Sequence, residues 1–169
     1  MSPKDRFSWL ILTFGGSGAA PKAPGTFGSL AAICVAGILW GAGVRELWLM
    51  PALAALIALL HLGVGDRIEA VFGEEDPGAV VSDEACGQWI ALAVPIASDV
   101  PFGYTLAIGF GLFRLFDITK WLGVGRLEKI PGKWGVLLDD VLAGLYAGLV
   151  LFALDAGGVL ALLPSFSSS

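Results

Sequence analysis

The amino-acid sequence predicts an all-α fold, a membrane-embedded bundle of about five apolar helices. Composition is the first reason, because 56% of the 169 residues are hydrophobic and only 15% are charged, whereas an average soluble domain has about 25% charged residues. The second reason is that the apolar runs are rich in leucine and alanine, which favours helix over strand. The length suits one domain over residues 1–169, with residues 1–6 and 165–169 expected as flexible tails.

Five apolar segments supply the expected helices: Leu30–Gly43, Leu47–Gly65, Ala85–Ala97, Phe102–Phe116 and Val136–Leu163. The first four have 13–19 residues, and an ordinary membrane-spanning helix needs roughly 20. We therefore expect helices that are short, tilted or partly re-entrant.

The basic residues are distributed unevenly around these segments. If all five segments cross a membrane, residues 1–29, 66–84 and 117–135 share one side. Nine of the ten Lys and Arg residues lie on that side or at an adjoining helix end, and only Arg45 lies opposite. The positive-inside rule makes the basic side cytoplasmic. The net charge of −5 and the lack of a basic stripe argue against a nucleic-acid partner.

An acidic motif begins the third apolar segment. In DPGAVVSDEACGQWIAL, from Asp76 to Leu92, Asp83 and Glu84 precede the apolar run, and Gln88 shares a helical face with Glu84. Acidic side chains favoured by a helix N-terminus explain this pattern. A functional site explains it as well, and the sequence leaves both interpretations open.

A second acidic motif lies inside the fifth segment. In WGVLLDDVLAGLYAG, from Trp134 to Gly148, Asp139 and Asp140 lie among apolar residues, where a functional site is the default hypothesis. Adjacent helical residues point about 100° apart, so we expect only one of the two to face a given metal ion, unless the helix begins nearby. Gly144 and Gly148 have the spacing of close helix packing.

A mixed-charge motif ends the fourth segment. FRLFDITK carries Arg114, Asp117 and Lys120 at three-residue spacing. On a helix they form one polar stripe, either a neutralising salt-bridge face or a metal-binding carboxylate flanked by two phosphate-binding cations. Several carboxylates without a His or Cys cluster suit Mg²⁺, which also bridges to phosphate. The only histidine, His61, lies deep in an apolar segment and is expected to be a packing residue.

A glycine-rich stretch, GGSGAAPKAPGTFGSL, precedes the first apolar segment. It lacks the pattern of a Walker-type loop, G-x-x-x-x-G-K-[ST]. Thr26 or Ser29 could cap the following helix and leave free N–H groups for an anion. Lys22 lies on the side of the carboxylates, so we interpret the stretch as a phosphate-binding loop with Lys22 as its charge.

Three motifs in order, GSGAAPKAPGTFGSL, DPGAVVSDEACGQWIAL and FRLFDITK…GKWGVLLDDVLAGLYA, resemble the phosphatidylglycerophosphatase A family from about Phe14 to Leu151. The resemblance implies an all-helical, Mg²⁺-dependent phosphatase, multi-pass in the bacterial inner membrane, with its active site facing the cytoplasm. Such an enzyme removes the terminal phosphate of phosphatidylglycerophosphate and leaves phosphatidylglycerol. One departure is that Trp121, Leu122 and Gly123 follow Lys120, where the family usually has Lys-Pro-x-Pro.

The motifs and the resemblance together assign the site residues. The expected Mg²⁺ ligands are Asp83, Glu84, Asp139 and Asp140, with Asp117 and Asp76 as further ligands. The first four acids and Lys22 form the expected catalytic set, and the expected substrate-binding residues are Lys22, Thr26, Ser29, Gln88, Arg114 and Lys120. The expected partners are a phospholipid substrate and the membrane. An alternative function is a small ion or metal transporter, which would place its carboxylates near the bilayer midplane.

Overall fold

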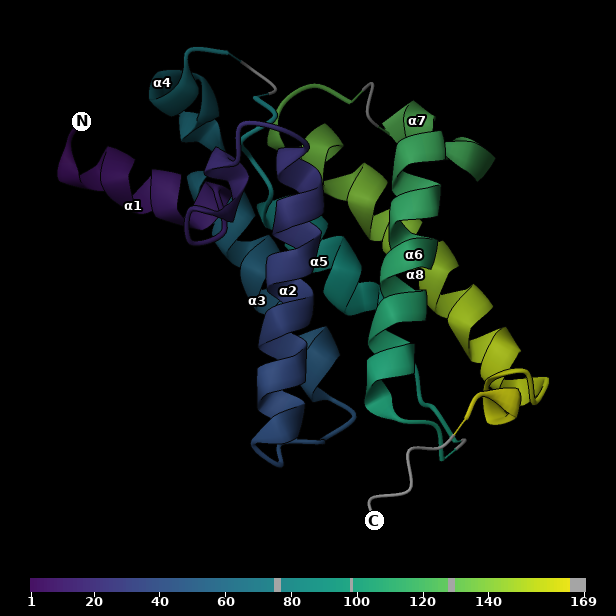
Figure 1. The fold of residues 1–169 in the computed structure, drawn as a ribbon. Helices are drawn as coiled ribbons and strands as arrows, with labels where there is room; N and C mark the ends of the chain where they lie inside the picture. The colour runs from purple at the N-terminus through teal and green to yellow at the C-terminus, as the bar shows by residue number, and fades with distance from the viewer. Residues whose placement is uncertain (75–76, 98, 128–129, 165–169) are drawn as a thin grey trace.

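The computed structural model describes residues 1–74, 77–97, 99–127 and 130–164, and the regular secondary structure in these ranges is all helical. The elements in order are α1 (Pro3–Leu12), η1 (Ser17–Ala19), α2 (Pro24–Gly41), α3 (Leu49–Val64), η2 (Gly65–Arg67), α4 (Ile68–Phe72), α5 (Ser82–Ala91), α6 (Phe102–Thr119), η3 (Trp121–Gly123), α7 (Val124–Leu127), α8 (Lys133–Ala156) and η4 (Leu160–Leu162). The long helices α2, α3, α6 and α8 run along the bundle, and the short helix α5 lies among them (Figure 1).

Helix α5 is the centre of the bundle. It packs against α2, α3, α6 and α8, and eight of its 10 residues are buried. At 1.5 Å per residue it is about 15 Å long, half the thickness of a bilayer core. The third predicted segment therefore forms a buried half-length helix.

The other predicted segments form longer helices. Each overlaps one of α2, α3, α6 and α8, although α2 and α8 begin before the predicted segments and α6 ends after its segment, so a helix is present in all five predicted segments. Three stretches among the described residues are long and apolar enough to cross a membrane, namely Pro24–Gly41, Leu49–Phe72 and Lys133–Ala156. The number of candidate spans is thus smaller than the five crossings on which the charge count was based.

Glycines let α5 and α8 approach closely. A Cβ atom added to Gly144 would collide with the carbonyl oxygen of Gly87. One added to Gly87 would lie 2.5 Å from the Asp140 carbonyl oxygen and 2.5 Å from Phe113 Cε2. The backbones of α5 and α8 are therefore in direct contact, which confirms the close packing predicted from Gly144.

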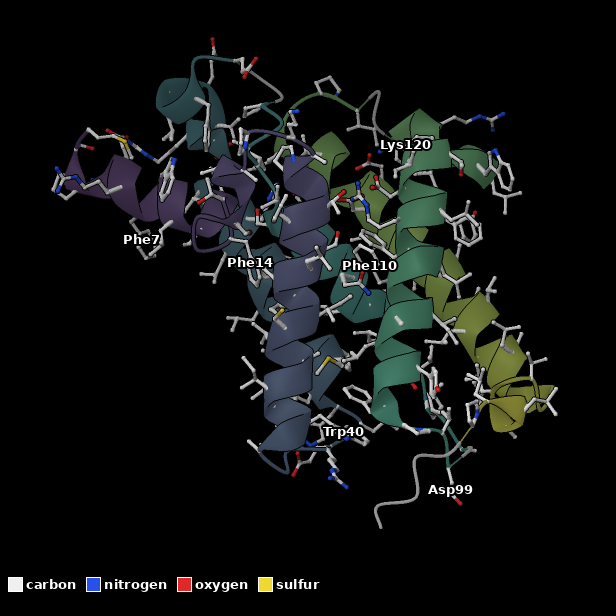
Figure 2. The ribbon with its side chains drawn as sticks, viewed as in Figure 1. Phe7, Phe14, Trp40, Asp99, Phe110 and Lys120 are labelled. Atoms are coloured by element: carbon white, nitrogen blue, oxygen red, sulfur yellow. The ribbon has the colours of Figure 1, made fainter. Side chains whose placement is uncertain are left out.

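The ends of the bundle differ. Figure 1 shows α1, α4 and α7 at one end, where α2, α5 and α8 begin and α6 finishes, and the α2–α3 connection at the other end. Lys120 lies at the first end, whereas Trp40 and Asp99 lie at the opposite end (Figure 2). The grouping of chain segments expected from the charge count is therefore present. The side of a membrane that each end faces stays a prediction.

The N-terminal segment is more ordered than expected. Residues 3–6, assigned above to a flexible tail, form the first turn of α1, and Ser2 and Asp5 make a reciprocal capping box there. An ion pair between Asp5 and Arg67 ties α1 to η2. The other expected tail, residues 165–169, lies outside the described residues.

Candidate functional site

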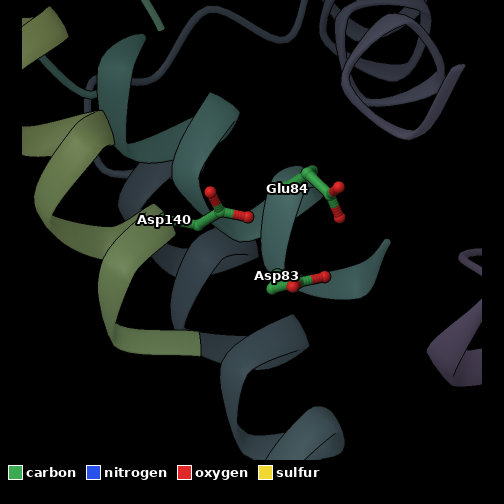
Figure 3. Close-up of side chains that lie close together, drawn as sticks. All are labelled: Asp83, Glu84 and Asp140. Carbon is green, nitrogen blue, oxygen red and sulfur yellow. The ribbon is translucent and has the colours of Figure 1, made fainter. Parts of the chain in front are cut away.

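Three carboxylates meet where α5 begins, close to α8. Asp83 and Glu84 lie in the first turn of α5, and Asp140 lies on α8 (Figure 3). One carboxylate oxygen from each lies within 4.8 Å of the others. We call Asp83, Glu84 and Asp140 the carboxylate cluster.

Two members of the cluster are buried and Glu84 is half-buried. Asp83 is 6% exposed and Asp140 is 3% exposed, although a helix N-terminus favours acidic side chains equally well at the surface. Burying a carboxylate costs several kcal/mol unless a partner compensates its charge. Helix capping by itself does not explain such burial, so the functional interpretation of this motif is the better one.

Each member of the cluster has a buried oxygen that lacks a hydrogen-bond partner among the described residues. These oxygens are Asp83 Oδ1, Glu84 Oε2 and Asp140 Oδ1. Buried polar atoms are nearly always paired in folded proteins, so such atoms need an explanation. Several convergent, unpartnered carboxylate oxygens fit a hard divalent cation such as Mg²⁺.

The electrostatics of the cluster support this fit. Burial, followed by the negative charges of Glu84 and Asp140, raises the pKa of Asp83 well above its usual range. Burial raises the pKa of Glu84 to about 7, and the charge of Asp117 acts in the same direction. A cation would offset the repulsion that adds to the effect of burial on both pKa values.

Two of the other three predicted carboxylate ligands, Asp139 and Asp117, pair with cations instead. Lys120 Nζ lies 2.5 Å from Asp139 Oδ2 and 3.3 Å from Asp117 Oδ1. Arg114 Nη1 lies 2.6 Å from Asp117 Oδ2. Asp140 therefore joins the cluster while its neighbour Asp139 pairs with Lys120, and the expectation that only one of the adjacent aspartates faces a given ion stays a prediction.

Lys120 occupies a special backbone position. It ends α6 in the left-handed conformation, with φ 53°, which is unfavourable for a residue other than glycine. Burial alone would lower the pKa of its ammonium, but the hydrogen bond to Asp139 and the nearby carboxylates together raise it above its usual value. Lys120 therefore keeps its positive charge beside Asp117 and Asp139.

A pocket of about 270 Å³ contains these groups. Its lining residues are Pro77, Gly78, Val80, Asp83, Glu84, Asp117, Lys120, Ile130, Pro131, Gly132, Val136, Asp139 and Asp140. Since a water molecule takes roughly 30 Å³ in the liquid, the pocket has room for a phosphate group together with a hydrated cation. Asp76, a further predicted ligand, lies outside the described residues.

The start of α2 lies against Glu84, one of the residues that line this pocket. A Cβ atom on Gly25 would collide with Glu84 Oε1 and would lie 3.3 Å from Arg114 Nη1. Glycine is thus needed there for close approach, a contact that sequence reasoning missed because nothing local signals it. Lys22 is exposed three residues earlier and makes no ion pair with any described residue.

The capping expected from Thr26 or Ser29 is wrong. Helix α2 begins at Pro24, its N-cap is Ala23, and no side chain caps it. Thr26 is half-buried within the first turn. The buried Ser29 hydroxyl donates a 3.0 Å hydrogen bond to the Gly25 carbonyl oxygen inside the helix, so it is already engaged.

Gln88 is placed one turn along α5 from Glu84. It is 0% exposed, and neither of its amide atoms has a hydrogen-bond partner in the described part of the chain. Arg114 also has a buried, unpartnered Nε. Their role as substrate contacts stays a prediction, and neither Gln88 nor Arg114 lines the pocket.

Comparison with known proteins gives one family. The family described as phosphatidylglycerophosphatase A matches residues 10–155. A protein of Bacteroides thetaiotaomicron described as a candidate phosphatidylinositol-3-phosphatase is 40% identical over 84% of this chain and 89% of its own length. Proteins called phosphatidylglycerophosphatase A are 38% identical in Haemophilus influenzae, over 83% of each chain, and 31% identical in Escherichia coli, over 85% of this chain and 81% of that protein. No solved structure matches.

Proposed function

The chain belongs to the phosphatidylglycerophosphatase A family and is a lipid phosphatase, and we propose that it converts phosphatidylglycerophosphate to phosphatidylglycerol and phosphate. The observation that carries the proposal is the buried carboxylate cluster beside Lys120 and Arg114. Acids that bind a metal, next to cations that bind phosphate, are the groups that hydrolysis of a phosphomonoester needs. The transporter alternative does not agree with relatives named as phosphatases.

We assign Asp83, Glu84 and Asp140 as the residues that would hold Mg²⁺. Their buried oxygens without partners among the described residues support this assignment. When bound, Mg²⁺ supplies positive charge that polarises a phosphoryl oxygen and favours attack by water. Asp139 and Asp117 would act beside it, since both carboxylates hold a cation in place.

The cations of the chain bind the phosphate in this proposal. Lys120 and Arg114 are both tied to Asp117, so their charges are positioned before a substrate arrives. An ammonium has three N–H donors. Lys120 therefore donates one hydrogen bond to a phosphate oxygen in this proposal, and its interaction with Asp139 becomes correspondingly weaker. Gly25 in the first turn of α2 lies against Glu84, where a helix N-terminus favours an anion, and in this proposal the exposed Lys22 adds its charge on this side.

The arrangement of apolar helices suits a lipid substrate. The cluster lies between the first turn of α5 and α8, at the end of the bundle that carries most of the basic residues. Acyl chains would remain beside the apolar helices while the phosphate enters the pocket. We propose that this end faces the cytoplasm at the bacterial inner membrane, because basic residues concentrate on that side of membrane proteins.

A second substrate has specific support. The relative from Bacteroides thetaiotaomicron, at 40% identity, is described as acting on phosphatidylinositol 3-phosphate. That lipid also carries a phosphomonoester on a polar headgroup, so the same metal and cation groups would serve it. The two substrates differ in the size of the alcohol that leaves.

Phosphate release from the purified protein tests these proposals. Phosphatidylglycerophosphate, phosphatidic acid and phosphatidylinositol 3-phosphate are each supplied with Mg²⁺ or with a chelator. We expect the fastest release from phosphatidylglycerophosphate and loss of release in the chelator. Faster release from phosphatidylinositol 3-phosphate would overturn the substrate assignment alone. Full activity in the chelator would overturn the role of the metal.

A further inference from the structure

The only histidine bridges two helix starts. His61 lies in α3 and is 0% exposed. Its Nδ1 lies 2.8 Å from Ser82 Oγ, and its Nε2 lies 3.2 Å from the Lys133 carbonyl oxygen. Ser82 is the first residue of α5, and Lys133 is the first residue of α8. The residue expected to be packing alone therefore makes two polar contacts across the bundle.

The partners determine how the imidazole is protonated. The Lys133 carbonyl oxygen can only accept a hydrogen bond, so Nε2 of His61 carries the hydrogen and donates it. In the neutral ring, Nδ1 then accepts the hydrogen of the Ser82 hydroxyl. Both nitrogens are satisfied at once, which an apolar side chain of the same size cannot reproduce.

The two helices joined by His61 carry the two halves of the carboxylate cluster. Asp83 and Glu84 follow Ser82 directly, and Asp140 lies two turns after Lys133. Their negative charges repel one another in a buried site, and this repulsion pushes the starts of α5 and α8 apart. The contacts of the His61 ring oppose that movement.

The end of α3 holds the start of α8 by further contacts. A Cβ atom on Gly65 would lie 2.5 Å from Lys133 Cβ, so the two segments touch. Lys133 Nζ also lies 2.7 Å from Asp66 Oδ2. The start of α8 is therefore fixed against α3, and the Ser82 contact extends this fixed arrangement to α5.

We propose that His61 is a positioning residue, which sets the spacing between the starts of α5 and α8 and thereby brings Asp83 and Glu84 to Asp140. Its consequence for Mg²⁺ rests on the proposed function. Loss of the bridge should weaken Mg²⁺ binding about tenfold, the lower end of what loss of supporting contacts costs a metal site. The lipid KM should change less than the Mg²⁺ requirement, since no phosphate-binding cation is touched.

Matched variants test the proposal. His61→Leu removes both contacts, Ser82→Ala removes the α5 contact, and His61→Gln keeps an amide donor for the Lys133 carbonyl. The control is Trp89→Phe, which removes another buried hydrogen bond of α5, the 3.0 Å bond from Trp89 Nε1 to the Ala32 carbonyl oxygen on α2. This control removes a hydrogen bond between α5 and α2 and leaves both contacts of His61 in place.

Two quantities are measured on the detergent-solubilised full chain. The first is the Mg²⁺ requirement. It is the Mg²⁺ concentration that gives half of the maximal rise in the thermal unfolding midpoint, and it is also determined from the Mg²⁺ dependence of phosphate release. We expect it to increase about tenfold in His61→Leu, less in His61→Gln, and less than twofold in Trp89→Phe. Ser82→Ala should not increase the Mg²⁺ requirement further in the His61→Leu background, because the hydrogen bond between His61 and Ser82 is already lost. If His61→Leu lowers the thermal unfolding midpoint but leaves the Mg²⁺ requirement unchanged, His61 only stabilises the fold, and the proposal is overturned.

The second quantity is amide hydrogen exchange without metal. His61→Leu should speed exchange in the first turns of both α5 and α8, whereas Trp89→Phe should affect α5 and α2. If the unmodified protein shows no response to Mg²⁺, the proposed metal role fails, and exchange then decides the His61 proposal. Faster exchange in both first turns supports the bridge, and faster exchange in α3 alone overturns it. If His61→Leu does not fold, Ser82→Ala and His61→Gln give the same comparison.

Discussion

At the scale of single residues, the five acids of the pocket divide into two sets. Asp83, Glu84 and Asp140 have buried oxygens without partners among the described residues. Asp117 and Asp139 instead hold Arg114 and Lys120. Residues of one chemical type therefore have different roles, because their neighbours differ.

Substitution of the adjacent aspartates should separate these roles. Asp140→Asn removes a proposed ligand, so we expect phosphate release to fall at least about a hundredfold with a large increase in the Mg²⁺ requirement. Asp139→Asn should act through Lys120 and therefore resemble Lys120→Met, with a raised lipid KM. Kinetics at varied Mg²⁺ and lipid concentrations measure both effects. Equal Mg²⁺ requirements in Asp140→Asn and the unmodified enzyme would contradict the ligand assignment.

The pH response of the metal-free protein follows from Glu84. Burial raises its pKa from 4.5 to about 7, so between these values the folded state binds more protons than the unfolded state. The free energy of unfolding should therefore fall as pH rises through that window. Thermal unfolding in a chelator should show a higher midpoint at the acidic end than at the basic end. Both Mg²⁺ and the substitution Glu84→Gln should reduce this difference. If Glu84→Gln leaves the pH dependence of the unfolding midpoint unchanged, other groups cause it.

At the scale of helices, the contact between α5 and α8 determines where the cluster forms. Gly87 and Gly144 allow the two backbones to touch, and α5 ends after 10 residues in the middle of the bundle. The short helix thus presents its first turn, rather than its side, to α8. The site depends on this packing as much as on the acids themselves.

Adding one methyl group to each of two glycines tests this dependence. Gly144→Ala places a Cβ against the Gly87 carbonyl oxygen, and overpacking of this kind costs about 1–3 kcal/mol. We expect a lower unfolding midpoint and weaker Mg²⁺ binding. The matched control is Gly111→Ala on α6, where nothing lies within 4 Å of the added atom; it should be neutral or stabilising, because alanine favours helix. Equal effects of the two substitutions would argue against the contact.

At the scale of the whole molecule, apolar side chains cover the outside of the bundle. Ile38, Leu59 and Leu149, one on each candidate span, are 71%, 69% and 63% exposed. The polar site lies inside one end instead. A lipid environment would cover these side chains, since soluble proteins rarely expose large apolar surfaces.

The orientation of the bundle is tested by thiol labelling. In a Cys34→Ser background, Lys22→Cys and Arg45→Cys place single accessible thiols at opposite ends, because Cys86 is buried. A membrane-impermeant thiol reagent should label Arg45→Cys in intact cells and Lys22→Cys only after the membrane is opened. The reverse pattern would contradict the cytoplasmic assignment.

The sequence by itself determined the features that depend on neighbouring residues in the chain. Apolar segments rich in leucine and alanine predicted all five main helices, because local composition strongly influences helix formation. The acidic motifs also contained the three residues that form the carboxylate cluster. The start of α2 and the end of α5 were predicted less accurately, because α2 begins at Pro24 without a side-chain cap and α5 ends at Ala91, six residues before the apolar run ends at Ala97.

Only the tertiary structure decided which groups meet. The approach of Gly25 to Glu84, the pairing of Lys120 with Asp139 and the bridge from His61 each join segments that are distant in the chain. No local pattern encodes such contacts, because they arise when whole helices pack and their backbones approach. The acidic residues could therefore be identified from the sequence. The packing of the helices decided that Asp83, Glu84 and Asp140 form the carboxylate cluster while Asp117 and Asp139 pair with cations.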